Sequence, residues 1–285
     1  MILSGRARLA GVTGWPVGHS LSPRLHNYWL ERYGIDGAYV PLPVAPEHFA
    51  ASLTSLARLG FAGVNVTVPH KEAALAAVDE VDDAARRIGA VNTVVFAPDG
   101  RARGSNTDGF GFVENLRAAR PGWTCRGGRV TVLGGGGAAR AVVAALADDG
   151  AADIRLVNRT ESRARALAAA LGGPVTVLGW DKREKALEGI DLLVNTTALG
   201  MAGNPPLALD LAALPAGAVV CDIVYAPLET PLLAAARRRG NACVNGLGML
   251  LHQARPGFAA WFGRDPEVTE EARAFVLEGL TARTG

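Results

Sequence analysis

The chain has 285 residues, of which 49% are hydrophobic and 20% charged, as in an ordinary globular protein, and its length favours two domains. The 29 basic and 27 acidic side chains leave a formal net charge of +2, which gives no reason to expect nucleic acid or an anionic membrane as a partner. No stretch of about 18 uninterrupted apolar residues occurs, and the N-terminal apolar run is too short for a signal peptide, so we expect a cytoplasmic protein.

Cysteine and histidine usage gives no sign of disulfides or metal sites. The three cysteines, Cys125, Cys221 and Cys243, lie far apart without C-x-x-C spacing, which indicates a reducing compartment. None of the five histidines is spaced as in H-E-x-x-H, so no metal site is expected.

Short apolar runs typical of strands alternate with helical stretches from residue 7 to about residue 95. The expected strands are 9–14, 38–44, 63–68 and 93–96, and the expected helices are 23–34, 46–60 and 71–89. This alternation predicts an open, mostly parallel α/β sheet.

A second alternating series begins near residue 130. Its expected strands are 129–134, 154–159, 175–180, 190–197, 218–225 and 241–246, and its expected helices include 138–150, 162–173 and 231–236. The strands are nearly continuous runs of Val, Ile and Leu, as parallel strands covered on both faces should be. After residue 246 we expect only helices, at 249–254 with its continuation and at 266–282, and Pro256 should kink or restart the first.

Residues 130–146, VTVLGGGGAARAVVAAL, contain a glycine-rich loop. Gly134, Gly136 and Ala139 fit the pattern G-x-G-x-x-G/A between a strand and an apolar helix. Glycines let the backbone approach a pyrophosphate, which the helix N-terminus then stabilises. The context favours a Rossmann-type dinucleotide-binding domain over a merely tight turn.

The end of the next strand favours NADP over NAD. NAD sites usually carry an acid at the C-terminal end of this strand, but Asp153 precedes the strand. The C-terminal end reads Asn158-Arg159-Thr160, with Arg163 one helical turn later, and a guanidinium binds a 2′-phosphate well. Alternatively, Arg159 is a solvated cation at a helix start, and Thr160 can also act as an N-cap.

These patterns predict three segments along the chain. Residues 1–106 should form one α/β domain, residues 107–246 the NADP-binding domain, and residues 247–285 helices that pack back on the first domain. The first boundary lies in GSNTDGFGF, residues 104–112, which is rich in glycine and small polar residues.

The stretch GVNVTVPHKEAA, residues 63–74, ends a strand with polar side chains and then opens a helix with Lys71. A helix N-terminus disfavours positive charge, and α/β folds place ligands at the ends of strands. Lys71 is therefore a candidate for binding or catalysis, with a surface cation on a turn as the alternative.

Nine stretches taken together resemble the shikimate dehydrogenases, NADP-dependent enzymes of aromatic amino-acid biosynthesis. They are GHSLSPRLHN (18–27), GVNVTVPHKE (63–72), GAVNT (89–93), SNTDG (105–109), LGGGGAAR (133–140), VNRT (157–160), NTTALGM (195–201), CDIVYAPLETPLL (221–233) and NGLGMLLHQA (245–254). The resemblance spans nearly the whole chain. It departs at Gly135, where alanine is common, and at Ala226, where asparagine is common.

The resemblance implies reversible reduction of 3-dehydroshikimate to shikimate by NADPH, with residues 1–106 as the substrate-binding and catalytic domain. Lys71 and Asp108 match the family's catalytic pair, an acid–base unit in which either member can carry the proton. Hydride transfer to a ketone leaves an alkoxide, which needs a proton donor and positive charge nearby. The matched substrate-binding residues are Ser20 and Ser22 for the carboxylate, Asn65, Thr67, Asn92 and Gln253 for hydroxyl groups, and Tyr225 near the substrate. The matched cofactor residues are Gly134, Gly135, Gly136, Gly137 and Ala138 for the pyrophosphate, Asn158, Arg159, Thr160 and Arg163 for the 2′-phosphate, Ile223 and Gly246 near the nicotinamide, and Asp83.

Some of these residues, and the activity itself, admit a second interpretation. Ser22, followed by Pro23, suits a helix N-cap, and Asp108 also suits a cap. A serine hydrolase is disfavoured because no G-x-S-x-G occurs and His19 is only a sequence neighbour of Ser20. A quinate/shikimate dehydrogenase and a non-catalytic NADP-binding sensor are the rival functions, although a sensor should lack Lys71 or Asp108. The expected partner is a small-molecule substrate, and the expected state is a monomer or homodimer.

Overall fold

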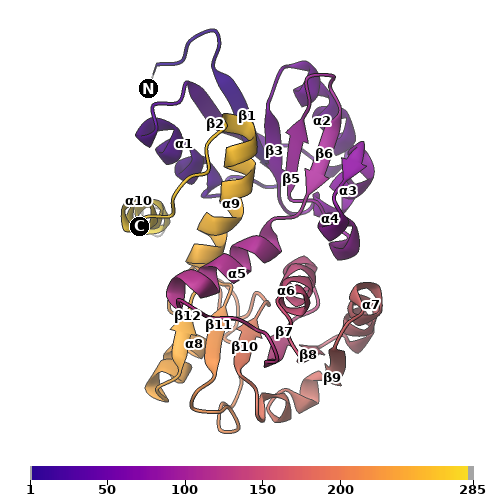
Figure 1. The fold of residues 1–285 in the computed structure, drawn as a ribbon, viewed down its shortest axis with the longest axis vertical. Coiled ribbons are helices and arrows are strands. Elements are labelled where there is room, and N and C mark those ends of the chain that lie inside the picture. The colour runs from indigo at the N-terminus through magenta and orange to yellow at the C-terminus, as the bar shows by residue number, and fades with distance from the viewer. Residues whose placement is uncertain (1, 282–285) are drawn as a thin grey trace. The chain divides into compact units, whose positions relative to one another are not determined.

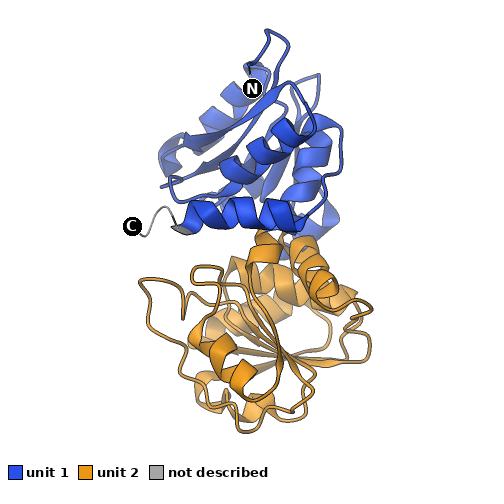
Figure 2. Ribbon diagram, turned by 90° about the vertical axis from the view of Figure 1, so that its left-hand side faces the viewer, with its two compact units in different colours: residues 1–107, 251–285 blue, residues 108–250 orange. Residues whose placement is uncertain are grey.

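The chain divides into two compact units, coloured blue and orange in Figure 2. The computed structural model describes residues 2–281, so Ala282, the expected last residue of the C-terminal helix, lies outside them. Unit 1 comprises residues 1–107 and 251–285, and unit 2 comprises residues 108–250. Both units are α/β, and the C-terminal residues belong to unit 1, which confirms the predicted fold class.

Unit 1 contains a six-stranded, mostly parallel sheet in the order β2-β1-β3-β5-β6-β4. Figure 1 labels these strands except β4. The strands are β1 (Arg8–Gly14), β2 (Gly37–Pro43), β3 (Gly63–Val66), β4 (Glu80–Val81), β5 (Thr93–Phe96) and β6 (Ala102–Ser105). β1 pairs in parallel with β2 and β3, and β4 pairs in parallel with β6, whereas β5 runs antiparallel to both its neighbours.

The helices of unit 1 pack on this sheet, except the last, which packs against the first. They are α1 (Ser22–Arg32), η1 (Pro46–His48), α2 (Phe49–Arg58), α3 (Lys71–Ala77), α4 (Asp83–Ile88) and α10 (Glu270–Thr281). Phe49 and Leu53 of α2 belong to one buried cluster with Val64 and Val66 of β3. Burying one such side chain contributes about 1.5–3 kcal/mol, so this packing supports the strand on which Asn65 lies.

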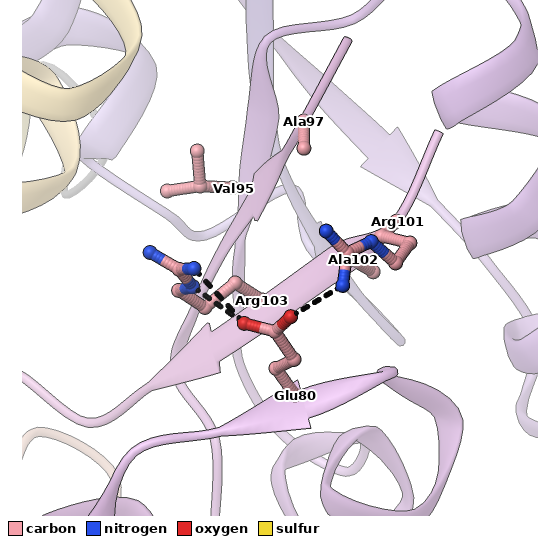
Figure 3. A pocket seen from close by; sticks show the side chains of 6 residues that line it. All are labelled: Glu80, Val95, Ala97, Arg101, Ala102 and Arg103. Atoms are coloured by element: carbon pink, nitrogen blue, oxygen red, sulfur yellow. Dashed lines mark hydrogen bonds and ion pairs between the residues drawn. The ribbon is translucent and has the colours of Figure 1, made fainter. Parts of the chain in front are cut away.

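The single helix expected over residues 71–89 is wrong. The structure breaks it into α3, β4 and α4, because β4 pairs with β6. Glu80 forms ion pairs with Arg101 (2.8 Å) and Arg103 (2.9 Å), which join the two strands (Figure 3). Asp82 then caps α4 by accepting a backbone N–H of its first turn at 2.6 Å. β4 and β6 were both missed because they are short and carry charged side chains.

Unit 2 contains a six-stranded, fully parallel sheet in the order β12-β11-β10-β7-β8-β9. Its strands are β7 (Arg129–Leu133), β8 (Asp153–Asn158), β9 (Val175–Gly179), β10 (Leu192–Asn195), β11 (Val219–Asp222) and β12 (Ala242–Val244). This is the strand order of the Rossmann fold, in which ligands bind at the carboxyl ends of the strands near the point where the order reverses. Every predicted strand of this series is confirmed.

The helices of unit 2 cover a core of aliphatic side chains. They are α5 (Asp108–Ala119), α6 (Gly137–Asp148), α7 (Glu161–Leu171), η2 (Trp180–Lys182), η3 (Lys185–Leu187) and α8 (Pro231–Arg238). Val142 and Leu146 of α6 and Leu116 of α5 belong to one fully buried cluster with Val132 and Val194 of the sheet. The start of α6 is thereby fixed against the end of β7, where the glycine loop lies.

Helix α9 (Leu247–Phe262) runs without interruption through Pro256, so the expected restart of the helix there is wrong. Proline removes one backbone hydrogen bond, but buried side chains beyond it hold the helix in place. Phe258 and Trp261 are almost fully buried, and Trp261 Nε1 donates to Val94 O at 3.0 Å. Across residues 2–281, each helix is too short or too polar to traverse a lipid bilayer.

Candidate active site

The turn between β3 and α3 is fixed by His70. Its ring is buried, stacks on Phe49 with centroids 4.6 Å apart, and places Nε2 2.7 Å from Val44 O. Lys71 is consequently the first residue of α3 and is half-buried. Its carbonyl accepts from Val91 N at 2.9 Å, which places the backbone of Lys71 beside the segment that carries Asn92.

The Asn65 side chain is held by three hydrogen bonds. Its Nδ2 donates to the backbone O of Asn92 at 3.2 Å and to Thr93 Oγ1 at 3.1 Å. Its Oδ1 accepts from Tyr39 Oη at 2.7 Å. Because a backbone carbonyl only accepts, the atom facing it must be the amide nitrogen, and the orientation of the Asn65 amide follows.

The same reasoning fixes Asn92. Its Oδ1 accepts from Thr107 N at 2.9 Å, and a backbone N–H only donates. The same Oδ1 accepts from Thr93 Oγ1 at 3.0 Å. Thr107 Oγ1 accepts from Asn92 Nδ2 at 3.1 Å and donates to Gln253 O at 2.8 Å. Hydroxyl groups of Thr93 and Thr107 therefore bring Asn65, Asn92 and the backbone of Gln253 together in unit 1.

The two predicted carboxylate-binding serines lie where α1 begins. Ser22 is the first residue of the helix, after Leu21 at the cap position, and no side chain caps the helix. Ser22 N donates to Ser20 Oγ at 3.2 Å, so the two hydroxyls belong to one short segment. The interpretation of Ser22 as the N-cap is wrong, because the helix begins with Ser22 itself. Thr67, the remaining predicted substrate residue of the β3 end, is half-buried, and its N–H donates to Thr13 O at 2.9 Å.

Sequence reasoning missed Tyr39, which lies buried on β2 beside these residues. Burial raises the pKa of Tyr39 well above its ordinary value, and the Ser22 hydroxyl opposes that rise. The ring stacks on His26 with centroids 3.9 Å apart and an interplanar angle of 4°. Burial lowers the pKa of His26 to about 3, and neither of its ring nitrogens has a hydrogen-bond partner among residues 2–281. In the sequence, Tyr39 is indistinguishable from a strand aromatic that only packs.

The glycine loop in unit 2 has the geometry of a phosphate cradle. Gly134 has a φ of +122°, and a Cβ there would lie 2.4 Å from Thr196 Oγ1. A Cβ on Gly135 would lie 2.8 Å from Asn158 Nδ2, which brings the loop next to the end of β8. Gly136 and Gly137 instead face open space, and α6 begins there without a side-chain cap. The backbone N–H groups of the first turn of α6, which Ala138 continues, can therefore bind an anion.

The end of β8 carries the residues predicted to bind the 2′-phosphate. Asn158 Nδ2 donates to Thr160 O at 2.8 Å. Arg159 and Arg163 are exposed, and neither guanidinium pairs with a carboxylate within residues 2–281. Thr160 occupies the N-cap position of α7, as expected, but its side chain makes no capping hydrogen bond.

Two acids flank β8, and each forms an ion pair with an arginine. Asp153 lies at the start of β8, as expected, and pairs with Arg155 at 3.1 Å. Glu161, in the first turn of α7, pairs with Arg165. Residues 158–160, at the end of β8, therefore include the cation Arg159 and no carboxylate.

Gly246 approaches the backbone of Ile223 very closely. A Cβ on Gly246 would lie 1.9 Å from Ile223 O, and Gly246 N donates to Val224 O at 3.1 Å. The structure thus brings together the two residues predicted to lie near the nicotinamide.

Asp222, which sequence reasoning missed, holds this loop. Its buried carboxylate accepts from Asn195 Nδ2 (3.0 Å), Val224 N (3.1 Å) and Thr230 Oγ1 (2.7 Å). Burial raises the pKa of Asp222, and these hydrogen bonds oppose the rise. The sequence signal that could have identified Asp222 is its position as an acid directly after the apolar strand residues AVVC. Tyr225 follows in the same loop and is half-buried.

The remaining candidates divide between the units. Asp108 opens α5 in unit 2 and is buried, whereas Lys71 belongs to unit 1. Asp83 is exposed in the first turn of α4 in unit 1, whereas the other predicted cofactor residues belong to unit 2. Its role stays a prediction.

Comparison with known proteins gives consistent matches. A family model described as the shikimate dehydrogenase substrate binding domain matches residues 12–94, and one described as shikimate / quinate 5-dehydrogenase matches residues 118–201. The chain is 63% identical to a protein of Paramagnetospirillum magneticum named shikimate dehydrogenase (NADP(+)), over 96% of this chain and 100% of that protein.

Two solved structures are similar over nearly their whole length. Shikimate 5-dehydrogenase of Thermus thermophilus, in complex with NADP(H) and shikimate, is 37% identical with a TM-score of 0.83, over 96% of this chain and 99% of that one. Quinate dehydrogenase of Corynebacterium glutamicum, in complex with NAD, is 32% identical with a TM-score of 0.88, over 95% of this chain and 99% of that one. The identity to the Paramagnetospirillum protein extends over both units, and the chain therefore belongs to the shikimate dehydrogenase family.

Proposed function

We propose that the protein catalyses the reversible, NADPH-dependent reduction of 3-dehydroshikimate to shikimate. The observation that carries the proposal is the near full-length identity to a relative named shikimate dehydrogenase (NADP(+)). The predicted substrate side chains Asn65 and Asn92 also share one buried hydrogen-bond network, as a site for a small polyhydroxylated acid requires.

The cofactor assignment rests on the donors in unit 2. The open backbone at Gly136 and Gly137 suits a pyrophosphate, and the exposed cations Arg159 and Arg163 suit a 2′-phosphate. These residues fit NADP, which when bound supplies or accepts the hydride through its nicotinamide ring. NAD lacks the 2′-phosphate, so it gains nothing from Arg159.

The protein's own contribution is position and proton transfer. In the direction of reduction, the ammonium group of Lys71 stabilises the negative charge that develops on the substrate oxygen. Lys71 and Asp108 act as one acid–base unit that delivers a proton to this oxygen and removes it in the reverse direction. Ser20 and Ser22 hold the carboxylate, while Asn65, Thr67, Asn92 and Gln253 bind ring hydroxyls.

The test is an absorbance assay at the nicotinamide band with shikimate and quinate, each against NADP and NAD. We expect the highest kcat/KM with shikimate and NADP, and higher activity with quinate and NAD would refute the assignment. Lys71→Ala should lower kcat about 10²- to 10⁴-fold with a modest change in KM. The matched control is Lys182→Ala, which removes an exposed lysine on η2 and should match the wild type. A rise in KM alone for Lys71→Ala would make Lys71 a binding residue instead.

We also propose a cytoplasmic location, which the cysteines support. All three are free thiols, two of them buried. The oligomeric state, monomer or homodimer, stays a prediction.

A further inference from the structure

The hydrogen bonds around Asn65 leave it only one way to contact a ligand. Both hydrogens of Nδ2 are used, one on Asn92 O and one on Thr93 Oγ1. Oδ1 accepts from Tyr39 Oη, and no other donor among residues 2–281 reaches it. An amide oxygen has two lone pairs, so one remains. Asn65 can therefore accept one further hydrogen bond and can donate none.

Neither hydroxyl partner of Asn65 can reverse its role without breaking a bond. Thr93 Oγ1 accepts from Asn65 and donates to Asn92 Oδ1, whose orientation the N–H of Thr107 fixes. Tyr39 Oη must donate to Asn65, because it faces a carbonyl oxygen. In its hydrogen bond with the Ser22 hydroxyl, Tyr39 Oη is therefore the acceptor. Tyr39 is 1% exposed and stacks on His26, so its ring has little freedom to turn the hydroxyl away.

We infer that Tyr39 and Thr93 are positioning residues that hold the Asn65 amide so that it accepts a hydrogen bond from a substrate hydroxyl. This inference rests on the proposed function. The acceptor oxygen of Asn65 repels a keto oxygen and attracts a hydroxyl. Asn65 therefore recognises one of the two ring hydroxyls that are not oxidised, since these are present in both shikimate and 3-dehydroshikimate. Tyr39 determines specificity without contacting the substrate.

The chain offers matched variants for a test. Tyr39→Phe removes the hydroxyl but keeps the ring that stacks on His26. Tyr33→Phe is the control: it removes a hydroxyl of the same unit that accepts from Glu267 N at 3.0 Å, outside the network. Thr93→Val and Thr93→Ser form a second pair, because valine lacks the hydroxyl that Asn65 needs and serine keeps it.

Initial rates would be measured with shikimate and with two analogues that each lack one of the non-reacting ring hydroxyls. We expect Tyr39→Phe to raise the KM for shikimate about 3- to 10-fold, leaving the KM for NADP unchanged and kcat within about threefold. For the analogue that lacks the hydroxyl bound by Asn65, the same substitution should change KM less than about twofold. Tyr33→Phe and Thr93→Ser should match the wild type. Thr93→Val should raise the KM for shikimate at least as much as Tyr39→Phe, because it also removes a donor to Asn92 Oδ1.

An unchanged KM for shikimate in folded Tyr39→Phe would overturn the inference. It would also be overturned if Tyr39→Phe raised the KM for both analogues as much as the KM for shikimate. If thermal unfolding shows that Tyr39→Phe does not fold, the comparison of Thr93→Val with Thr93→Ser decides in the same way. A wild-type protein that does not oxidise shikimate with NADP would instead refute the proposed function. An active wild type with indifferent variants would refute only the positioning role.

Discussion

Buried His26 should make unit 1 lose stability as the pH falls. The ring is fully buried, its neighbours Trp29, Tyr39, Phe258 and Trp261 carry no charge between pH 5 and 7, and its nitrogens have no partners within the described chain. Its folded-state pKa is about 3, below the ordinary 6.5. Between these two values the unfolded chain binds one proton more than the folded chain, so stability falls as the pH drops below about 6.5.

The magnitude follows from the two pKa values. Between pH 7 and pH 5, protonation of His26 in the unfolded chain alone lowers the free energy of unfolding by about 2 kcal/mol. His26→Met keeps an apolar side chain of similar length and removes the titration. It forfeits the stack on Tyr39, which amounts to about 1 kcal/mol and does not change over this pH range. The loss between pH 7 and pH 5 should therefore be about 2 kcal/mol smaller in His26→Met than in the wild type.

The assay is urea unfolding of both proteins at pH 7 and pH 5, followed by tryptophan fluorescence, because Trp29 contacts His26. His48→Met, which replaces an exposed histidine of η1, is the control and should keep the wild-type difference. If the free energy of unfolding fell equally between pH 7 and pH 5 in the wild type and in His26→Met, the buried ring would accept its proton without penalty. That result would refute the reasoning.

Three further substitutions test the site residues. Ser22→Ala should raise the KM for shikimate about 10-fold in steady-state assays and leave the KM for NADP unchanged, because a hydroxyl that holds the carboxylate is lost. Equal rises in both KM values would contradict carboxylate binding. Arg159→Ala should raise the KM for NADP about 10- to 100-fold but leave the KM for NAD within about twofold, and a matching rise for NAD would exclude a 2′-phosphate contact. Gly246→Ala should lower the free energy of unfolding by about 1–3 kcal/mol in urea titrations, because the added Cβ would lie 1.9 Å from Ile223 O. It should also raise the KM for NADP. An unchanged free energy of unfolding would show that the loop can move to accept the Cβ.

The sequence predicted unit 2 well because its signals are local. Each buried parallel strand is a continuous apolar run, and the glycine loop stands between a strand and a helix. Gly134 has a positive φ, and Gly246 lies very close to the Ile223 backbone, so only glycine fits at either position without strain. The pattern G-x-G-x-x-G/A singled out Gly134 before the structure showed its neighbours, whereas Gly246 was named only through the family resemblance.

Unit 1 was predicted less completely because its missing parts depend on distant partners. Residues 80–81 form β4 only by pairing with residues 103–104 of β6, and nothing in their own composition indicates a strand. Tyr39 acquires its role from Asn65, 26 positions away, and from His26 on α1. An aromatic residue on a strand is expected to pack, so only the structure reveals its hydrogen bond.

The two units differ in how their binding residues are supported, and this difference separates the two specificities of the protein. In unit 1, Asn65 and Asn92 are buried, and each depends on hydroxyl groups that do not themselves need to contact the substrate. Removing one partner leaves a buried polar atom unsatisfied, at about 1–3 kcal/mol. In unit 2, Arg159 is exposed and pairs with no carboxylate within the described chain, so replacing it disturbs no buried contact. Cofactor preference can therefore change by single surface substitutions with little effect on stability, whereas a change of substrate requires coordinated substitutions throughout a buried network.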